Sequence, residues 1–247
     1  TVVEQRQGPP RLPLELAFAT LATVSGGAGA STPVVATPPS APATVPATGA
    51  EATDAAGGRG AWVALTAAGA RPDPPDPLTE KRGRGVVLVV AGRTGSAGAA
   101  VLAGRGALAA GAGLVTVAVP EPVRAEVAAA HPALMTVGLP ADVDGALHPD
   151  AVHALPLDEV DAVVAGPGLG TGPGVVAVVA HLRRTCRRLV LDADALNVHR
   201  DAPDTLADHP ADAALVLTPH ARELDRIGGA GTYADRSVRV PDLAVRW

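Results

Sequence analysis

Short aliphatic runs alternate with alanine-rich stretches from Leu78 onward, and this alternation constrains the fold more than any other feature of the sequence. The run over 86–90 is aliphatic at every position, which is typical of a strand buried on both faces of a parallel sheet. Helices between successive strands imply right-handed βαβ crossovers. We therefore predict an α/β fold of three layers, with a mainly parallel sheet between two helical layers. The expected strands cover 86–90, 114–119, 162–165, 189–191 and 215–217, and the expected helices cover 99–110, 120–130 and 173–184.

Composition is consistent with that fold and excludes several classes of protein. Aromatic residues make up only 2% of the 247 residues, so the core must be built from Val, Leu and Ala. The net charge of −5 argues against a general basic face for nucleic acid. The single cysteine excludes a disulfide framework and fits a reducing compartment. The strongly apolar, uncharged run 106–120 is shorter than the roughly 18 residues that a membrane span needs. We expect a cytoplasmic protein that binds neither nucleic acid nor membrane.

The first 77 residues differ from the rest of the chain. The segment 31–50 consists mainly of Pro, Ala and Thr, and it contains no charged and no aromatic residue. Proline removes backbone donors, and the remaining side chains offer too little apolar area to offset the entropy of ordering. A second proline cluster, 71–77, marks a boundary. We therefore predict a largely disordered linker over 1–77 and a folded domain over 78–247.

Four segments that could carry chemistry follow predicted strands, namely 92–98, 166–170, 191–197 and 218–223. The carboxyl ends of parallel strands meet at one edge of a sheet, and ligands bind there. The first two segments are rich in glycine and precede helices, which suits the approach of a phosphate to backbone N–H groups. The alternative is that these glycines only pack helix on strand. The spacing of the first segment fits neither a Rossmann fingerprint nor a Walker A loop.

The other two segments carry polar side chains. If the chain remains extended after the strand, Asp192 and Asp194 share a face. They could then hold Mg²⁺ through water, bind ribose hydroxyls or order the loop, and the alternative is that Asp194 caps a helix. In the last segment we expect Thr218 to be the N-cap and Pro219 the first helical residue. That arrangement leaves His220 in the first helical turn, at the edge of the sheet.

In chain order, these segments resemble the ADP/ATP-dependent NAD(P)H-hydrate dehydratases, whose fold is ribokinase-like. The resemblance rests on the segments 85–103, 109–118, 132–135, 166–170, 191–197 and 217–220. It implies an enzyme that phosphorylates the ring hydroxyl of hydrated NADH or NADPH with ADP or ATP and Mg²⁺. Loss of phosphate, a good leaving group, then restores the cofactor. The substrate-site residues implied are Ala99, Gly166, Gly168, Gly170, Asp192, Asp194, Asn197 and His220, and the adenine-nucleotide residues are Gly229, Gly231 and Thr232.

The sequence also departs from the family. The late Gly-Ser/Thr-Gly-Asp motif, whose aspartate is the expected base, is absent, so we assign no catalytic residue and no resident metal site. This predicts a domain incomplete at its C-terminal side, with repair that is slow or absent and with bared sheet and helix faces that favour self-association. The alternatives are a non-catalytic remnant that still binds dinucleotide, a ribokinase-like small-molecule kinase and, more weakly, a Rossmann oxidoreductase.

Overall fold

The computed structural model describes residues 78–228, 240, 243–244 and 246–247. The predicted linker over 1–77 therefore lies outside the described residues. So do Gly229, Gly231 and Thr232, for which the resemblance implies contacts with the adenine nucleotide.

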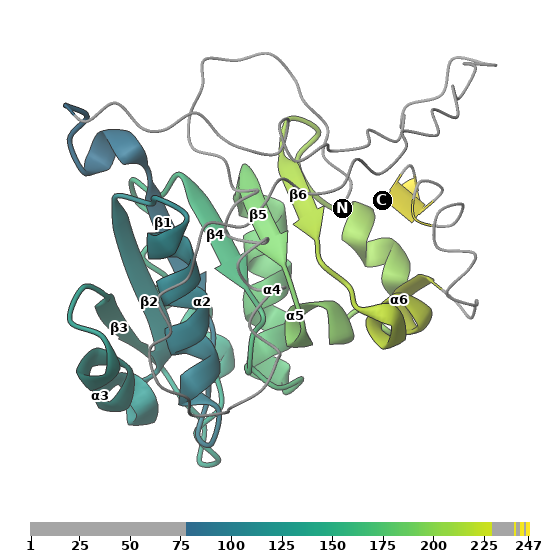
Figure 1. Cartoon of the computed structure of the whole chain (residues 1–247). Helices are drawn as coiled ribbons and strands as arrows, with labels where there is room; N and C mark the ends of the chain where they lie inside the picture. The colour runs from purple at the N-terminus through teal and green to yellow at the C-terminus, as the bar shows by residue number, and fades with distance from the viewer. Residues whose placement is uncertain (1–77, 229–239, 241–242, 245) are drawn as a thin grey trace, which may run out of the picture.

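Six parallel strands form one sheet in the order β3-β2-β1-β4-β5-β6 (Figure 1). The prediction of a parallel α/β sheet is thus confirmed. The chain adds β2 and β3 on one side of β1, and it then returns to add β4, β5 and β6 on the other side. The order reverses between β1 and β4, which is the switch point where open α/β sheets bind ligands. The strands are β1 (Val86–Val90), β2 (Leu114–Pro120), β3 (Met135–Leu139), β4 (Ala162–Ala165), β5 (Arg188–Leu191) and β6 (Ala214–Leu217).

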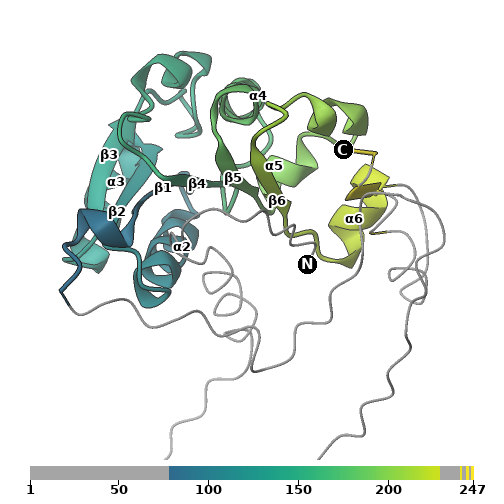
Figure 2. The same ribbon diagram turned by 90° about the horizontal axis from the view of Figure 1, so that it is seen from above.

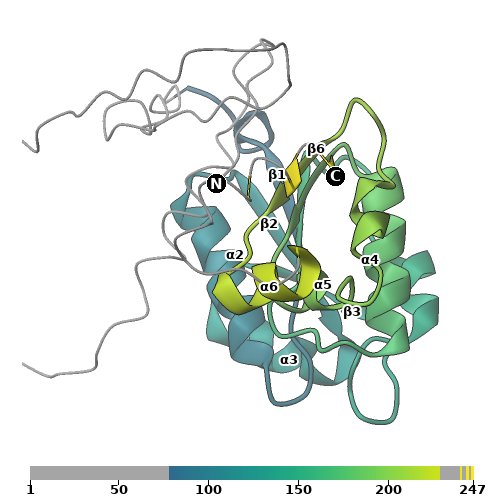
Figure 3. The same ribbon diagram turned by 90° about the vertical axis from the view of Figure 1, so that its right-hand side faces the viewer.

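Helices cover both faces of the sheet and complete the three layers that the sequence predicts. In the views from above and from the side, α2 and α3 lie on one face and α4 on the other (Figures 2 and 3). The helices are α2 (Ala97–Ala109), α3 (Glu121–Ala130), α4 (Pro173–Thr185), α5 (Asp194–Asn197) and α6 (Ala221–Gly228), with short 3₁₀ turns η1 (Arg82–Arg84), η2 (Pro149–Ala154) and η3 (Pro203–Ala207).

The core is aliphatic on both sides of the sheet, as the low aromatic content requires. Along β1, Leu88 and Val90 join the cluster that contains α4, whereas Val89 joins the cluster beneath α2 and α3. All three side chains are fully buried, because a central parallel strand has no solvent face. On α2, a Cβ added at Gly104 would lie 2.8 Å from Val117 Cγ2. Small residues therefore bring this helix close to the strands.

Two local predictions fail. The strand β3 was not predicted, because it lies at the edge of the sheet and has an exposed Met135 and a glycine at its fourth position. A Cβ at Gly138 would overlap the carboxylate of Glu121 at the start of α3, which accounts for that glycine. The last helix begins at Ala221, so the predicted start with Thr218 as N-cap and Pro219 as first helical residue is wrong.

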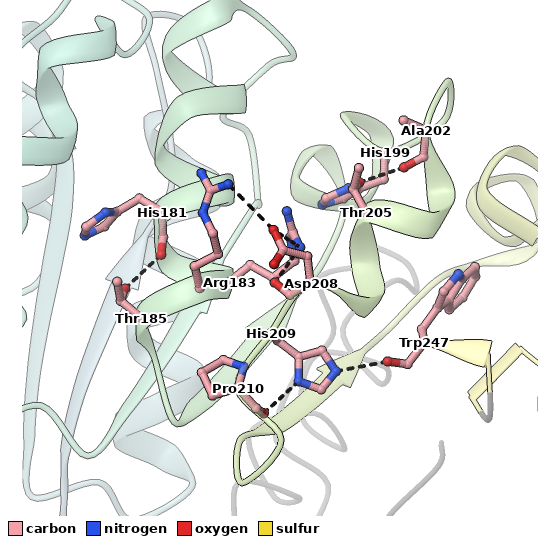
Figure 4. A network of polar contacts seen from close by, with 11 residues as sticks. His181, Arg183, Thr185, His199, Ala202, Thr205, Asp208, His209, Pro210 and Trp247 are labelled. Carbon is pink, nitrogen blue, oxygen red and sulfur yellow. Dashed lines mark hydrogen bonds and ion pairs between the residues drawn. The ribbon is translucent and has the colours of Figure 1, made fainter.

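A polar network links α4 to the segments around η3 (Figure 4). The buried guanidinium of Arg183 donates to the carbonyl oxygen of Asp208 at 2.6 Å and lies 3.3 Å from its carboxylate. Thr205 Oγ1 donates to the carbonyl of Ala202, so the ring Nδ1 of His199 must donate to Thr205 Oγ1 at 2.8 Å. Burial, and secondarily the charge of Arg183, lowers the pKa of His199 from 6.5 to about 4. His199 is therefore a neutral structural residue.

This neutral histidine predicts acid sensitivity of the fold. Between pH 6.5 and about 4 the unfolded chain binds a proton on His199 that the folded chain does not. The free energy of unfolding should therefore fall by up to about 3 kcal/mol as the pH drops through this window. Urea unfolding of the wild type and of His199→Asn at several pH values measures the effect, since Asn keeps a donor for Thr205 but cannot titrate. The exposed His153→Asn is the matched control. Equal pH slopes for wild type and His199→Asn would contradict the prediction.

Candidate functional site

The loops that follow β1 and β4 are hydrogen-bonded to each other at the switch point. The N–H of Gly92 donates to the carbonyl of Pro167 at 2.8 Å, and the N–H of Gly166 donates to the carbonyl of Val90 at 3.1 Å. Gly92 and Gly166 both have positive φ, at 77° and 132°, which L side chains rarely adopt. Two glycine segments far apart in the sequence thus form one continuous backbone surface at the carboxyl edge of the sheet.

Gly168 explains why the second loop is so rich in glycine. A Cβ at this position would lie 2.9 Å from the Cβ of Ala99 and 3.0 Å from the Cβ of Ser96, in the first turn of α2 and just before it. The loop after β4 therefore rests directly on the start of α2, with two small residues opposite the glycine. The structure brings Ala99 and Gly168 together, as expected if both belong to one site.

Asp194 connects the glycine loop after β4 to α5 and, through Asn197, to α6. Its Oδ2 accepts a hydrogen bond from the N–H of Gly170 at 2.8 Å, and its Oδ1 accepts one from the amide of Asn197 at 3.2 Å. The Oδ1 of Asn197 in turn accepts from Arg226 of α6 at 2.6 Å. Of the roles open to Asp194, loop ordering is the one its contacts support. The helix-cap alternative is wrong, because α5 begins at Asp194 and the carboxylate serves a different loop.

The two aspartates after β5 point to different neighbours. Thr218, just after β6, donates to Asp192 Oδ1 at 2.7 Å, whereas Asp194 turns toward the loop after β4. Ala193 between them has φ 50°, so the chain is not extended there and the two carboxylates do not share a face. Strained backbone of this kind in a non-glycine residue is found mostly where the surroundings fix it, often at functional sites.

His220 caps the N-terminus of α6. Its ring Nδ1 accepts from the N–H groups of Arg222 at 3.1 Å and Glu223 at 3.3 Å. The buried carboxylate of Glu223 accepts from the N–H of His220 at 2.9 Å, which completes a reciprocal capping box. Because Nδ1 accepts, Nε2 carries the ring proton, and it lies 3.1 Å from Glu223 Oε1. The exposed ring lies beyond Thr218 at the sheet edge, and its contact with substrate stays a prediction.

The described residues do not form a magnesium site. Within 78–228 and the described positions beyond, no group of three or more His, Cys, Asp or Glu side chains could hold a metal ion. The carboxylates of Asp192 and Asp194 face different partners and already accept hydrogen bonds. We therefore assign no described residue to Mg²⁺.

A family sequence model described as NAD(P)H-hydrate dehydratase matches residues 87–242, well over half of the chain. The chain belongs to the NAD(P)H-hydrate dehydratase family. It is 41% identical over 177 residues to a bifunctional NAD(P)H-hydrate repair enzyme of Salinibacter ruber, a match that covers 70% of this chain and 32% of that protein. It is 36% identical over 169 residues to an ADP-dependent (S)-NAD(P)H-hydrate dehydratase of Xanthomonas campestris, covering 67% and 56%. The chain thus spans about a third of the length of the bifunctional relative and just over half of the second.

Solved structures of family members and more distant proteins share the fold. The ADP/ATP-dependent NAD(P)H-hydrate dehydratase of Bacillus subtilis, co-crystallised with ATP/Mg²⁺, is 27% identical with a TM-score of 0.53, covering 67% of this chain and 55% of that one. A ribokinase-like protein of Enterococcus faecalis is 22% identical with a TM-score of 0.55, covering 69% and 58%. The ribokinase-like prediction is confirmed. None of the described helices is long and apolar enough to cross a membrane.

Proposed function

We propose that this dehydratase-family chain takes part in the repair of hydrated NADH or NADPH. The dinucleotide would bind to the glycine surface, which is formed by residues 92–98 and 166–170 at the switch point. The reaction transfers a phosphoryl group from ADP, or ATP with Mg²⁺, to the ring hydroxyl. A carbon–oxygen bond then breaks, phosphate leaves, and loss of a ring proton restores the double bond. Phosphorylation is needed because hydroxide is a poor leaving group and phosphate is a good one.

One observation carries this proposal, namely the way the loops after β1 and β4 are joined. Their hydrogen bonds join the two loops, and the glycines that remain accessible, exposed Gly95 and Gly98 and half-buried Gly168 and Gly170, carry no side chain that would hinder a ligand. Two helices, α2 and α4, begin directly after these loops, and their N-terminal N–H groups favour negatively charged ligands. The diphosphate gives a dinucleotide the negative charge that such a site favours. Asp192, Asp194, Asn197 and His220 would lie at the rim near the reacting ring.

We expect binding to exceed catalysis in this chain. Asp192 and Asp194 each accept a structural hydrogen bond, which makes both of them poor candidates for the base that activates the ring hydroxyl. A protein limited to residues 1–247 is therefore expected to repair the hydrate slowly with ADP while it retains dinucleotide affinity.

Two measurements test the proposed function. Quenching of reduced-nicotinamide fluorescence gives the affinity for NADH and NADPH, and recovery of nicotinamide absorbance from the hydrate with ADP or ATP gives turnover. Binding with turnover identifies the dehydratase, and binding without turnover identifies the non-catalytic alternative. A stable phosphorylated product without loss of phosphate would identify a kinase. Failure to bind any of these dinucleotides would refute the proposed function.

The location and assembly of the protein are part of the proposal. The single cysteine is consistent with the reducing cytoplasm, where the reduced dinucleotides are used. Self-association through the outer strands of the sheet is expected, and size-exclusion chromatography at several concentrations measures it.

A further inference from the structure

Arg93 is held in place by two different loops. Its neighbour Gly92 donates to the carbonyl of Pro167 in the loop after β4, at 2.8 Å. Its other neighbour, Thr94, donates to the carbonyl of Gly145 in the loop after β3, at 3.1 Å. The backbone of Arg93 is therefore fixed on both sides, at the point where three loops of the carboxyl edge meet.

The side chain of Arg93 extends across the switch point. A Cβ built on Gly170 would lie 3.2 Å from Arg93 Nε, 3.3 Å from its Cδ and 3.8 Å from its Cζ. The guanidinium group therefore lies against the glycine loop after β4, although Arg93 itself belongs to the loop after β1. Gly170 has φ 77°, so this position is suited to glycine for its backbone as well as for the space it leaves.

Arg93 has no acidic partner in the described part of the chain. No ion pair or side-chain hydrogen bond involves it, and the segments 91–98 and 166–174 contain no Asp or Glu. Asp194, which is bonded to the same Gly170, already accepts from Gly170 and Asn197. The exposed guanidinium of Arg93 is therefore the only formal charge in the two glycine segments. Its positive charge adds to that of the N-terminal ends of α2 and α4, which follow these segments. Guanidinium groups bind phosphate strongly, because their planar N–H donors match its oxygens.

We propose that Arg93 binds a phosphate group of the nucleotide ligand at the switch point, with the diphosphate of the dinucleotide as the expected contact. The inference rests on the proposed function, since it places the dinucleotide on the glycine surface that Arg93 crosses. Arg93 would then be a specificity-determining residue, because it should not raise the affinity for ligands that lack this phosphate.

The test compares Arg93→Ala, Arg93→Gln and Arg93→Lys with the wild type in titrations with NADH, NADPH and ADP. The affinity for NADH and NADPH should fall about tenfold in the Ala and Gln variants, and Lys should restore part of it. The salt dependence of binding should weaken in parallel. Arg105→Ala is the matched control, because Arg105 is an exposed arginine within α2 that loses the same charge away from the rim. Thermal unfolding checks that each variant is folded.

The results of these titrations distinguish the role of Arg93 from the proposed function. An equal loss for NADH and NADPH assigns Arg93 to the diphosphate, a loss confined to NADPH assigns it to the ribose phosphate, and a loss confined to ADP assigns it to the phosphoryl donor. Unchanged affinity in both neutral variants, with a wild type that binds NADH, overturns the role of Arg93 and leaves the proposed function standing. A wild type that binds none of the three ligands overturns both.

Discussion

Replacing Gly166 with alanine is expected to lower the free energy of unfolding by about 4 kcal/mol, enough to unfold much of a marginally stable domain. Two causes act together. Gly166 has φ 132°, which an alanine side chain opposes, and a Cβ there would overlap the carbonyl oxygen of Asp192 and lie 2.9 Å from the Cβ of Ala195. Because Gly166 and Asp192 end neighbouring central strands, neither backbone can move away without breaking sheet hydrogen bonds.

Chemical unfolding of the Gly166→Ala variant measures this loss, and Gly98→Ala provides the matched control. Gly98 lies in the first turn of α2, its φ is not positive, and nothing lies within 4 Å of an added Cβ. Alanine there should leave stability unchanged or raise it by about 0.5 kcal/mol. If both variants unfold at the same denaturant concentration as the wild type, the close packing of the two strand ends is not what requires glycine at 166.

Replacing Asp194 with alanine is expected to remove about 2 kcal/mol of stability and to weaken NADH binding about tenfold. The N–H of Gly170 and the amide of Asn197 would both lose their acceptor, and the glycine loop would lose its attachment to α5. Asp194→Asn should be milder, because one oxygen remains to accept from Gly170. Fluorescence titration and urea unfolding measure the two effects.

Asp158→Ala is the control for this variant, since Asp158 is an exposed aspartate without a hydrogen bond or ion pair in the described structure. An Asp194→Ala variant that keeps full stability and full NADH affinity would show that the contact with Gly170 is incidental. Loss of stability with unchanged affinity would restrict Asp194 to a purely structural role.

The parts of the fold that sequence predicts are those fixed by local chemistry. Val86–Val90 is recognisable because every side chain of a central parallel strand must be apolar. Pro173 marks the start of α4 because its fixed φ suits the first helical residue. β3 escapes prediction because an edge strand needs fewer apolar residues, and the glycine within it responds to Glu121 of another element.

The position of the candidate site can be predicted from the sequence, but the hydrogen-bond partners of its residues cannot. Gly166, Gly168 and Asp194 stand out because glycines and carboxylates directly follow buried strands. Arg226 carries no such signal, since an arginine within a polar helix is ordinary, and Thr218 was expected to cap a helix rather than to donate to Asp192. Their roles depend on which strand ends become neighbours, and that order is set by the whole sheet. His220 was placed at the correct edge, but its capping role was missed because histidine is an uncommon N-cap residue.

Asn197 links Asp194 and Arg226 through the two ends of its side-chain amide. Its amide presents oxygen to a cation on one side and nitrogen to an anion on the other, so only one of its two orientations satisfies both neighbours. Substitutions at 194, 197 and 226 should therefore be strongly non-additive, and a homologue's residues could be transplanted here only as a set of three.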